Sequence, residues 1–334
     1  MKDILNHLFS YKSFSRTESE QILTDLAKGK FNPSQMAAFL AAYAMRNITV
    51  PELQGFRDAM LNLCIPVSLE EFDPIDVCGT GGDGKNTFNI STLSSFVLSG
   101  AGYKVAKHGN YGISSISGSS NIMEYFGFRF TNHEDHLKET LDKTGICFLH
   151  APLFHPAMKS IAPIRRELGV KTFFNMLGPL VNPAKPKVQM VGVFNLELAR
   201  IYHHLFQESD SRYIILHSLD GYDEISLTDD IKIFSNQGEY ILDHTLFTSK
   251  ALESAKVKGG NTMEESADIF LKILEGNGTE AQTQVVLANT AMAISCYYPE
   301  KPLGTALEEA RNSLHGKKAL NSFRKLLEIN KNQN

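Results

Sequence analysis

The apolar residues in the first part of the chain recur at helical spacing. Ile22, Leu23 and Leu26 lie on one face of a segment that Ser15 opens. Two further helical patterns follow, each introduced by a proline where the first turn is expected. We therefore predict that residues 1–68 form an all-helical domain.

A polar linker, SLEEFDP, separates this region from a different pattern. Short apolar runs now alternate with helical patterns of about 10–15 residues, which is typical of a mainly parallel sheet covered by helices. The predicted domain is of the α/β class, spans residues 72–334 and has a mainly parallel central sheet with flanking helices. The runs that we interpret as strands are IDVCGT (75–80), YKVAKHG (103–109), GICFLHA (145–151), VQMVGVF (188–194) and YIILHS (213–218).

The last third of the chain contains one exception to this alternation. Residues 231–242 predict a β-hairpin that turns at Asn236-Gln237-Gly238. After it the pattern returns to helices, which we predict at 265–274, 283–298 and 305–329.

Composition and charge exclude several classes of protein. The 334 residues include 33 Lys and Arg against 37 Asp and Glu, a net charge of −4, which argues against a protein that binds nucleic acid through a basic surface. No apolar run approaches about 18 residues and the start of the chain lacks a signal-peptide core, so we expect neither membrane spanning nor secretion. The four cysteines form no CxxC pair, which favours reduced thiols and a cytoplasmic protein.

A glycine-rich turn, Gly79-Thr80-Gly81-Gly82-Asp83-Gly84, lies between a predicted strand and a predicted helix. Glycines at such a place allow the backbone to turn tightly and to approach a phosphate closely. The spacing GxGxxG also fits a dinucleotide site, but the second strand ends in Lys107-His108 instead of the acidic residue that would bind a ribose. A Walker A loop is excluded because Asn86 stands where Ser or Thr is needed for Mg²⁺.

The start of the next helix carries further polar groups. Asn89 or Ser91 is suited to cap it, and hydroxyls of Thr87, Ser91 and Thr92 lie beside its positive end. A helix N-terminus binds anions through its free N–H groups and its dipole, although ordinary capping without a ligand would explain any one of these residues.

A second polar loop, residues 107–121, follows the second predicted strand. It offers the cation of Lys107, many hydroxyls and free backbone N–H groups, with only Ile113 and Ile116 plainly apolar. These groups suit one phosphate or two linked phosphates, and the alternative is a solvated loop.

Six motifs of this chain occur in the same order in one known family. They are GTGGD (79–83), NIST (89–92), KHGN (107–110) with its Ser/Gly-rich run, HPAMK…APIRRELG (155–169), FNMLGPLVNP (174–183) and DGYDEIS (220–226). The sequence resembles the anthranilate phosphoribosyltransferase family over essentially the whole chain. This resemblance implies the fold class of the pyrimidine nucleoside phosphorylases. It also implies transfer of phosphoribose from 5-phosphoribosyl 1-pyrophosphate to the amine of anthranilate in tryptophan biosynthesis.

The resemblance also implies the site residues. The metal ligands would be Ser91, Asp223 and Glu224, holding Mg²⁺ as two ions per subunit, since hard oxygen donors suit this cation. An adjacent Asp-Glu pair has an alternative interpretation as a turn beside a strand. The residues implied for 5-phosphoribosyl 1-pyrophosphate are Gly79, Gly82, Asp83, Thr87, Asn89, Ile90, Ser91, Thr92, Lys107, His108, Gly109, Asn110, Tyr111, Gly112, Ile113, Ser114, Ser115 and Ser119.

For anthranilate the resemblance implies Gly79, Asn110 and Arg165, with His108 and His155 nearby. A guanidinium group is well suited to hold a carboxylate. We assign no catalytic acid or base, because an aromatic amine already exposes its lone pair at neutral pH. The histidines do not predict zinc, since no cysteine or third ligand lies at metal spacing.

Three positions depart from the common family pattern. Tyr111-Gly112 replaces an Arg followed by Ala or Ser, Ile116 replaces a Lys, and Asn121 replaces an Asp. The first two changes remove positive charge near the predicted phosphate loop. The alternatives to the family activity are a pyrimidine nucleoside phosphorylase and a non-catalytic relative that binds nucleic acid. The small-residue segment QMAAFLAAYAM (35–45) suggests a homodimer face, which agrees with the family's usual state.

Overall fold

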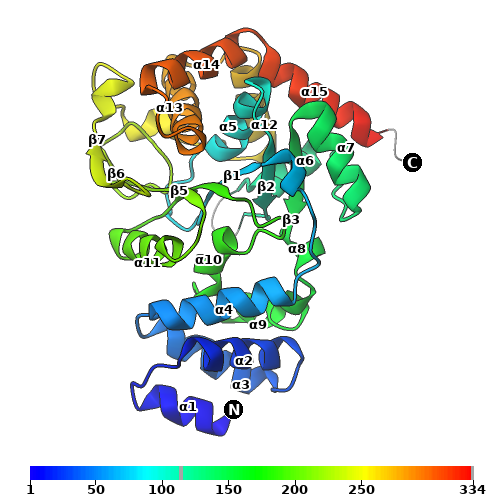
Figure 1. Cartoon of the computed structure of the whole chain (residues 1–334), viewed down its shortest axis with the longest axis vertical. Coiled ribbons are helices and arrows are strands. Elements are labelled where there is room, and N and C mark those ends of the chain that lie inside the picture. Colours follow the sequence, from blue (N-terminus) through cyan, green and yellow to red (C-terminus); the bar gives the residue numbers. More distant parts are fainter. Residues whose placement is uncertain (113–115, 332–334) are drawn as a thin grey trace. The chain divides into compact units, whose positions relative to one another are not determined.

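The computed structural model describes residues 1–112 and 116–331, which form two compact units (Figure 1). The first unit consists of Met1–Val67 and Ala151–Lys185, and the second of Ser68–His150 and Pro186–Asn334. The helical unit therefore includes a second segment, 151–185, which the sequence pattern assigns to the α/β domain.

The first unit contains only helices. Ser15 and Asn32 accept hydrogen bonds from Glu18 N and Gln35 N, so each caps a helix as its sequence predicts. The helices are α1 (Lys2–Phe9), α2 (Arg16–Ala27), α3 (Pro33–Ala44), α4 (Val50–Asn62), α8 (Ala151–Phe154), α9 (Ala162–Leu168) and α10 (Phe174–Leu177), with 3-10 turns η2 (Pro156–Lys159) and η3 (Gly178–Leu180).

Phe173 explains why the second segment joins this unit. Its ring stacks on Phe56 of α4 at 4.4 Å between centroids, and it packs edge-on or tilted against Phe39 and Tyr43 of α3. These four rings are buried together. Burial of large aromatic side chains favours this association more strongly than sequence proximity to the strands does.

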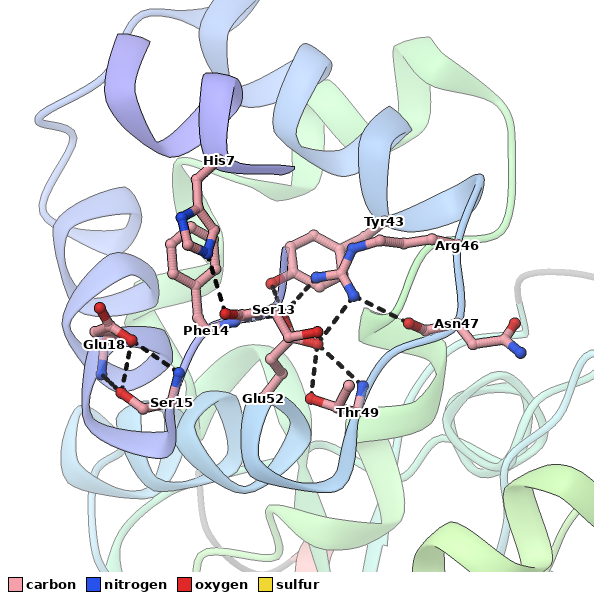
Figure 2. Close-up of polar contacts among 10 residues, drawn as sticks. All are labelled: His7, Ser13, Phe14, Ser15, Glu18, Tyr43, Arg46, Asn47, Thr49 and Glu52. Carbon is pink, nitrogen blue, oxygen red and sulfur yellow. Dashed lines mark hydrogen bonds and ion pairs between the residues drawn. The ribbon is translucent and has the colours of Figure 1, made fainter. Parts of the chain in front are cut away.

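Glu52 is the buried charge of the helical unit, and Figure 2 shows the groups that surround it. It pairs with Arg46 and accepts hydrogen bonds from Tyr43 Oη (2.9 Å), Thr49 N (3.0 Å) and Phe14 N (3.1 Å). Burial alone would raise the pKa of Glu52, but the bonds from Arg46 and Thr49 outweigh it and hold the pKa below its usual value. This carboxylate therefore joins α3, α4 and the segment before α2.

The second unit is built on a seven-stranded sheet in the order β3-β2-β1-β4-β5-β6-β7. Strands β1 to β5 pair in parallel, and β6 and β7 form an antiparallel hairpin at one edge. This confirms the predicted mainly parallel sheet and the predicted hairpin, in which Gly238 adopts a φ of 114°. The strands are β1 (Ile75–Gly79), β2 (Val105–Gly109), β3 (Ile146–His150), β4 (Val188–Gly192), β5 (Arg212–Ser218), β6 (Ile231–Ser235) and β7 (Gly238–Leu242).

Helices flank this sheet. Phe96 of α5, Phe270 of α12 and Phe323 of α15 pack ring against ring in the core. The helices and 3-10 turns are η1 (Glu70–Phe72), α5 (Ile90–Gly100), α6 (Ser119–Tyr125), α7 (Glu134–Thr144), α11 (Leu196–Gln207), η4 (His244–Leu246), η5 (Ser254–Val257), α12 (Met263–Leu274), α13 (Glu280–Tyr297), α14 (Leu303–His315) and α15 (Lys318–Lys331).

One helix prediction is wrong: residues 305–329 do not form one continuous helix. The pattern at 305–329 predicts a single helix, but the helix ends at His315, and Lys317 then adopts a left-handed φ of 61°. A Cβ on Gly316 would lie 2.5 Å from the carbonyl oxygen of Asn312, so the close turn requires glycine. The two shorter helices can then each bury an apolar face.

The strand order locates the place where a ligand is expected. The chain runs from β1 to β2 on one side of β1 and later returns to place β4 on its other side. Ligands of such sheets bind outside the carboxyl ends of the strands at this change of direction. Gly79 and Gly192 end β1 and β4 side by side there. In the described part of the chain, no helix is both long and apolar enough to cross a membrane.

Candidate active site

The glycine-rich turn begins where β1 ends. Gly81, Gly82 and Gly84 adopt φ values of 66°, 79° and 73°, a region that residues with a Cβ rarely enter. Three of the four residues from Gly81 to Gly84 have left-handed backbone conformations, which turn the chain sharply just after the carboxyl end of β1. The predicted tight turn is therefore confirmed, although its contact with phosphate stays a prediction.

An acidic segment, Asp223-Glu224, lies against this turn. Gly81 N donates a hydrogen bond of 2.6 Å to Oδ2 of Asp223. A Cβ on Gly192 would lie 1.6 Å from the carbonyl oxygen of Asp223, so the segment crosses the end of β4 in direct contact with its backbone. The fold thus brings together two motifs that are separated by more than a hundred residues in the sequence.

The electrostatics of this segment are unfavourable without a cation. Burial, and then the charges of Glu224 and Asp83, raise the pKa of Asp223 well above its usual value. Burial also raises the pKa of Glu224, against the opposing effect of Lys107 and of hydrogen bonds from Ser91. The three carboxyl groups therefore repel one another in a site shielded from water.

The same groups fit a divalent cation. Oδ2 of Asp83 is buried and has no hydrogen-bond donor among the described residues. Asp223, Glu224 and the Ser91 hydroxyl add hard oxygen donors, which Mg²⁺ prefers. The carboxylate oxygens of Asp83, Asp223 and Glu224 do not all lie within 4.8 Å of one another. Within the described ranges, the group that brings three carboxylate or histidine ligand atoms within 4.8 Å of one another is a different one: Asp230, Asp243 and His244.

Helix α5 begins at the predicted place, but Asn89 does not cap it with its side chain. Asn89 is the N-cap residue by position, and its amide binds Ser117 instead, at 2.9 and 3.0 Å. The backbone and hydroxyl of Ser91 bind Glu224. The positive end of α5 therefore faces the acidic segment. Thr87 lies in an isolated bridge with Lys258 next to this helix start.

Lys107 does not point into solvent. Its ammonium group is buried and donates a 2.7 Å hydrogen bond to the carbonyl oxygen of Val77. Burial lowers the pKa of Lys107, while the negative charge of Asp76 counteracts this. In this structure Lys107 thus places its charge against the backbone of β1, and its predicted contact with a phosphate stays a prediction.

The second predicted phosphate loop is anchored at both ends. The carbonyl oxygen of Asn110 accepts from Ser119 Oγ (3.4 Å), and Gly109 lies so close to Ser119 that a Cβ would be 2.3 Å from its hydroxyl. Oδ1 of Asn121 accepts from the N–H groups of Gly112 (2.8 Å) and Gly118 (3.0 Å). The predicted site residues Ile113, Ser114 and Ser115 lie outside the described residues.

Tyr111 shows what replaces the charge that the family usually has here. Its hydroxyl donates to Glu124 at 2.6 Å, and its ring packs edge-on against His150 at 4.9 Å between centroids. The side chain is therefore held by a helix and a strand end. Nothing about this contact supplies positive charge to the loop.

Arg165 and His155, two of the residues predicted for anthranilate, belong to the helical unit. The Arg165 guanidinium lies over the Phe174 ring at 5.1 Å and donates to Asn175 Oδ1 at 3.3 Å. Burial lowers the pKa of Arg165, and among the described residues no carboxylate pairs with it. This half-buried cation could accept an anionic ligand.

His155 is buried, and its burial lowers its pKa to about 4. Its imidazole is therefore neutral at neutral pH. In the second unit, His108 is also buried and its backbone N–H donates to Asp76 Oδ1 at 3.3 Å. Gly79 and Asn110, predicted for the same ligand, lie in that unit as well.

Sequence reasoning missed two polar residues of this region. Asp76 lies fully buried within β1, and Asn289 lies fully buried within α13. Asp76 stands alone in the apolar run IDVCG, and Asn289 stands beside Thr290 in the apolar run VVLANTAMA. An acid or an amide in a stretch that is otherwise core was the signal available, because such a group must find partners inside the protein.

Comparison with known proteins gives a consistent result over the full length. A family model described as the glycosyl transferase family, a/b domain, matches residues 71–320, and the helical bundle domain of that family matches residues 2–64. Anthranilate phosphoribosyltransferase from Flavobacterium psychrophilum is 56% identical over 98% of this chain and 99% of its own. The same enzyme from Christiangramia forsetii is 54% identical over 99% of this chain and 100% of its own.

Solved structures agree in fold. Anthranilate phosphoribosyltransferase from Thermus thermophilus superposes with a TM-score of 0.90 at 28% identity, over 98% of this chain and 99% of that one. The enzyme from Saccharomyces cerevisiae, in complex with PRPP and Mg, has a TM-score of 0.90 at 26% identity, over 99% of this chain and 97% of that one.

Proposed function

The chain belongs to the anthranilate phosphoribosyltransferase family, and we propose that it transfers the phosphoribosyl group of 5-phosphoribosyl 1-pyrophosphate to the amine of anthranilate, with release of pyrophosphate. This is a step of tryptophan biosynthesis. The observation that carries the proposal is the contact between the glycine-rich turn and the buried Asp223-Glu224 segment, in a chain that is similar to these enzymes along its whole length.

The reaction is a displacement at the anomeric carbon of the sugar. Positive charge develops on the ribose and negative charge on the departing pyrophosphate, so the protein must hold the pyrophosphate and place the amine on the opposite face. The backbone of the glycine-rich turn and the Asn110 loop supply N–H groups for the phosphates. Glycine at three left-handed positions keeps this backbone accessible.

Ser91, Asp223 and Glu224 would hold Mg²⁺, with Asp83 close by. When bound, the cation neutralises negative charge on the leaving pyrophosphate. The crowding of buried carboxyl groups supports this assignment, because it is relieved by a divalent cation. We propose two ions per subunit, as the family resemblance implies.

Arg165 would bind the carboxylate of anthranilate. It is a half-buried guanidinium without a carboxylate partner among the described residues, and it sits on an aromatic ring. Neutral His155, in the same unit as Arg165, can offer an uncharged contact to the ring. His108 and Asn110, which the family resemblance implies for the same ligand, belong to the other unit. The amine of anthranilate needs no strong base, so we propose no proton-abstracting residue.

The proposal extends to the state of the protein. We propose a cytoplasmic homodimer that uses helix α3 as part of its interface. In support, Ala37, Ala38, Ala41 and Ala42 of this helix are only partly covered, and Met45 just beyond its end is 89% exposed. Sedimentation of the purified chain tests this, and a monomer at all concentrations would refute it.

A pyrophosphate-release assay tests the activity. The chain is incubated with 5-phosphoribosyl 1-pyrophosphate and Mg²⁺, with and without anthranilate. We expect release that depends on anthranilate, and formation of one phosphoribosyl adduct of anthranilate for each pyrophosphate released. Phosphate-dependent cleavage of a pyrimidine nucleoside would instead identify a nucleoside phosphorylase, and nucleic-acid binding without any release would identify a non-catalytic relative.

A further inference from the structure

The Asp223-Glu224 segment is buried but is not part of a strand. Asp223 through Ser226 are all buried, yet they lie between β5 and β6 with no ladder partner. Buried backbone N–H and C=O groups need hydrogen-bond partners, and here no neighbouring strand provides them. The groups that do so determine where the two carboxylates lie.

Asn289 of α13 supplies the partners of Ile225. Its carboxamide nitrogen donates to the carbonyl oxygen of Ile225 at 2.9 Å, and its Oδ1 accepts from the N–H of Ile225 at 3.1 Å. The second amide hydrogen is directed to the carbonyl oxygen of Val285, also at 2.9 Å. One side chain thus makes the pair of bonds that an adjacent strand would make, and its own donors are both used.

Two further contacts fix the segment on other sides. Ser218 Oγ, at the end of β5, donates to the carbonyl oxygen of Glu224 at 2.7 Å. Gly192, at the end of β4, leaves space for the carbonyl oxygen of Asp223. Asn289 reaches the backbone of the segment from a helix, through a side chain 64 residues away in sequence.

We infer that Asn289 is a positioning residue for the proposed reaction: by clamping the backbone of Ile225 it orients the carboxylates of Asp223 and Glu224 toward the divalent cation. Among the described residues no hydrogen bond joins Asn289 to either carboxylate, and both of its amide hydrogens are donated to backbone carbonyl oxygens. The inference rests on the proposed function for the identity of the reaction, but the clamp can be tested without it.

Asn289→Leu is the informative variant, since leucine keeps the branching at Cγ and offers no hydrogen bond. Thr290→Val is the matched control: Thr290 is the next residue, equally buried, and its hydroxyl donates only to Val286 within its own helix at 2.8 Å. Both variants lose a buried polar contact of α13. Only the first loses contact with the acidic segment.

Two measurements do not require turnover. Hydrogen exchange of the peptide that contains Ile225 should accelerate in Asn289→Leu and stay at the wild-type rate in Thr290→Val. Binding of Mn²⁺ in the presence of pyrophosphate, followed by electron paramagnetic resonance, should weaken roughly 10- to 100-fold in Asn289→Leu, as for residues that orient metal ligands.

Turnover gives the third measurement. In Asn289→Leu the Mg²⁺ concentration for half-maximal rate should rise and kcat should fall, while the KM for anthranilate stays near wild type. A purely structural residue would lower the amount of folded protein and leave the magnesium requirement unchanged. If the leucine variant does not fold, Ser218→Ala replaces it, because it removes the neighbouring bond to Glu224 with a small change in volume.

The outcomes separate the two proposals. Wild-type Mn²⁺ affinity and magnesium requirement in both folded Asn289→Leu and Ser218→Ala would overturn the positioning role. A wild-type chain that binds Mn²⁺ and pyrophosphate but releases no pyrophosphate with anthranilate would overturn the proposed function. In that case a loss of Mn²⁺ binding in Asn289→Leu would still support the clamp.

Discussion

A Cβ atom on Gly79 would lie 2.5 Å from Oδ2 of Asp223. Gly79 does not have a positive φ, so any residue could adopt its backbone conformation. Glycine is needed here because there is no room for a side chain. Gly79 ends β1, and the carboxylate of Asp223, from the segment that follows β5, lies directly beside it. The first glycine of the turn is therefore coupled to the candidate metal site as well as to the phosphate turn.

Gly79→Ala should impair the candidate metal site while preserving the fold. Forcing a methyl group against a buried carboxylate costs about 1–3 kcal/mol in a packed region. We expect the larger Gly79→Val change to abolish turnover, with an unchanged helical circular dichroism signal from the N-terminal unit. Gly304, in the first turn of α14, has open space around it and no positive φ, so Gly304→Ala gives the control. Normal turnover of Gly79→Val would show that this glycine is remote from the reaction centre.

Neutralising the acidic pair tests the metal more directly. Asp223→Asn with Glu224→Gln keeps the shape of both side chains and removes both charges. We expect turnover to collapse and any residual activity to need much more Mg²⁺. Since burial raises the pKa of both groups, their charged forms disfavour the folded state above neutral pH. At pH 8 without metal, the double variant should therefore be at least as stable as the wild type.

A second adjacent acidic pair provides the matched control for this variant. Glu264 and Glu265 are exposed at the start of α12. Glu264→Gln with Glu265→Gln should leave the magnesium titration unchanged. Wild-type turnover of the Asp223→Asn, Glu224→Gln variant across that titration would remove the metal site.

Arg165→Ala should weaken the use of anthranilate. Loss of a charge-assisted hydrogen bond costs roughly 1.5–3 kcal/mol, which corresponds to about 10- to 150-fold in KM. The KM for 5-phosphoribosyl 1-pyrophosphate should change little. Arg166 is the adjacent, exposed arginine, so Arg166→Ala should leave both constants near wild type. An anthranilate KM unaffected by loss of Arg165 would contradict the assignment.

The buried His155 predicts a defined dependence of stability on pH. Its folded pKa, about 4, lies below the ordinary value of 6.5. Between these values the unfolded chain binds a proton that the folded chain excludes, so the free energy of unfolding falls as the pH decreases. This group alone accounts for a loss of about 2 kcal/mol between pH 7 and pH 5. His155→Asn should reduce that loss in urea titrations, whereas His204→Asn, at an exposed position, should not.

The Glu52 cluster sets the stability of the helical unit. Glu52→Gln would leave Arg46 without its counter-charge in a largely buried place, at a cost of about 3–5 kcal/mol in the free energy of unfolding. The exposed pair of Lys30 and Asp25 offers the comparison, because Lys30→Met should cost about 0–1 kcal/mol. Urea unfolding monitored by circular dichroism measures both. Equal effects would show that the buried network contributes no more than a surface pair.

Much of the architecture was predictable because it depends on local periodicity. The five parallel strands and the hairpin follow from short apolar runs and turn residues, and the caps at Ser15 and Asn32 follow from side chains that bond three residues ahead. Glycine positions likewise indicated the turn, since positive φ at Gly81, Gly82 and Gly84 is a local property. The motifs also identified the residues to examine, but not their distances.

Only the tertiary structure decided the contacts between distant parts of the chain. It placed Asp223 against Gly79, buried Lys107 against Val77, and moved residues 151–185 to the helical unit through the ring of Phe173. Each of these depends on which surfaces are buried together, and burial is a property of the whole chain that no local pattern encodes. For the same reason, the sequence does not reveal the role of Asn289. Its partner lies 64 residues away, and the bond exists because the sheet and α13 enclose a segment that has no strand beside it.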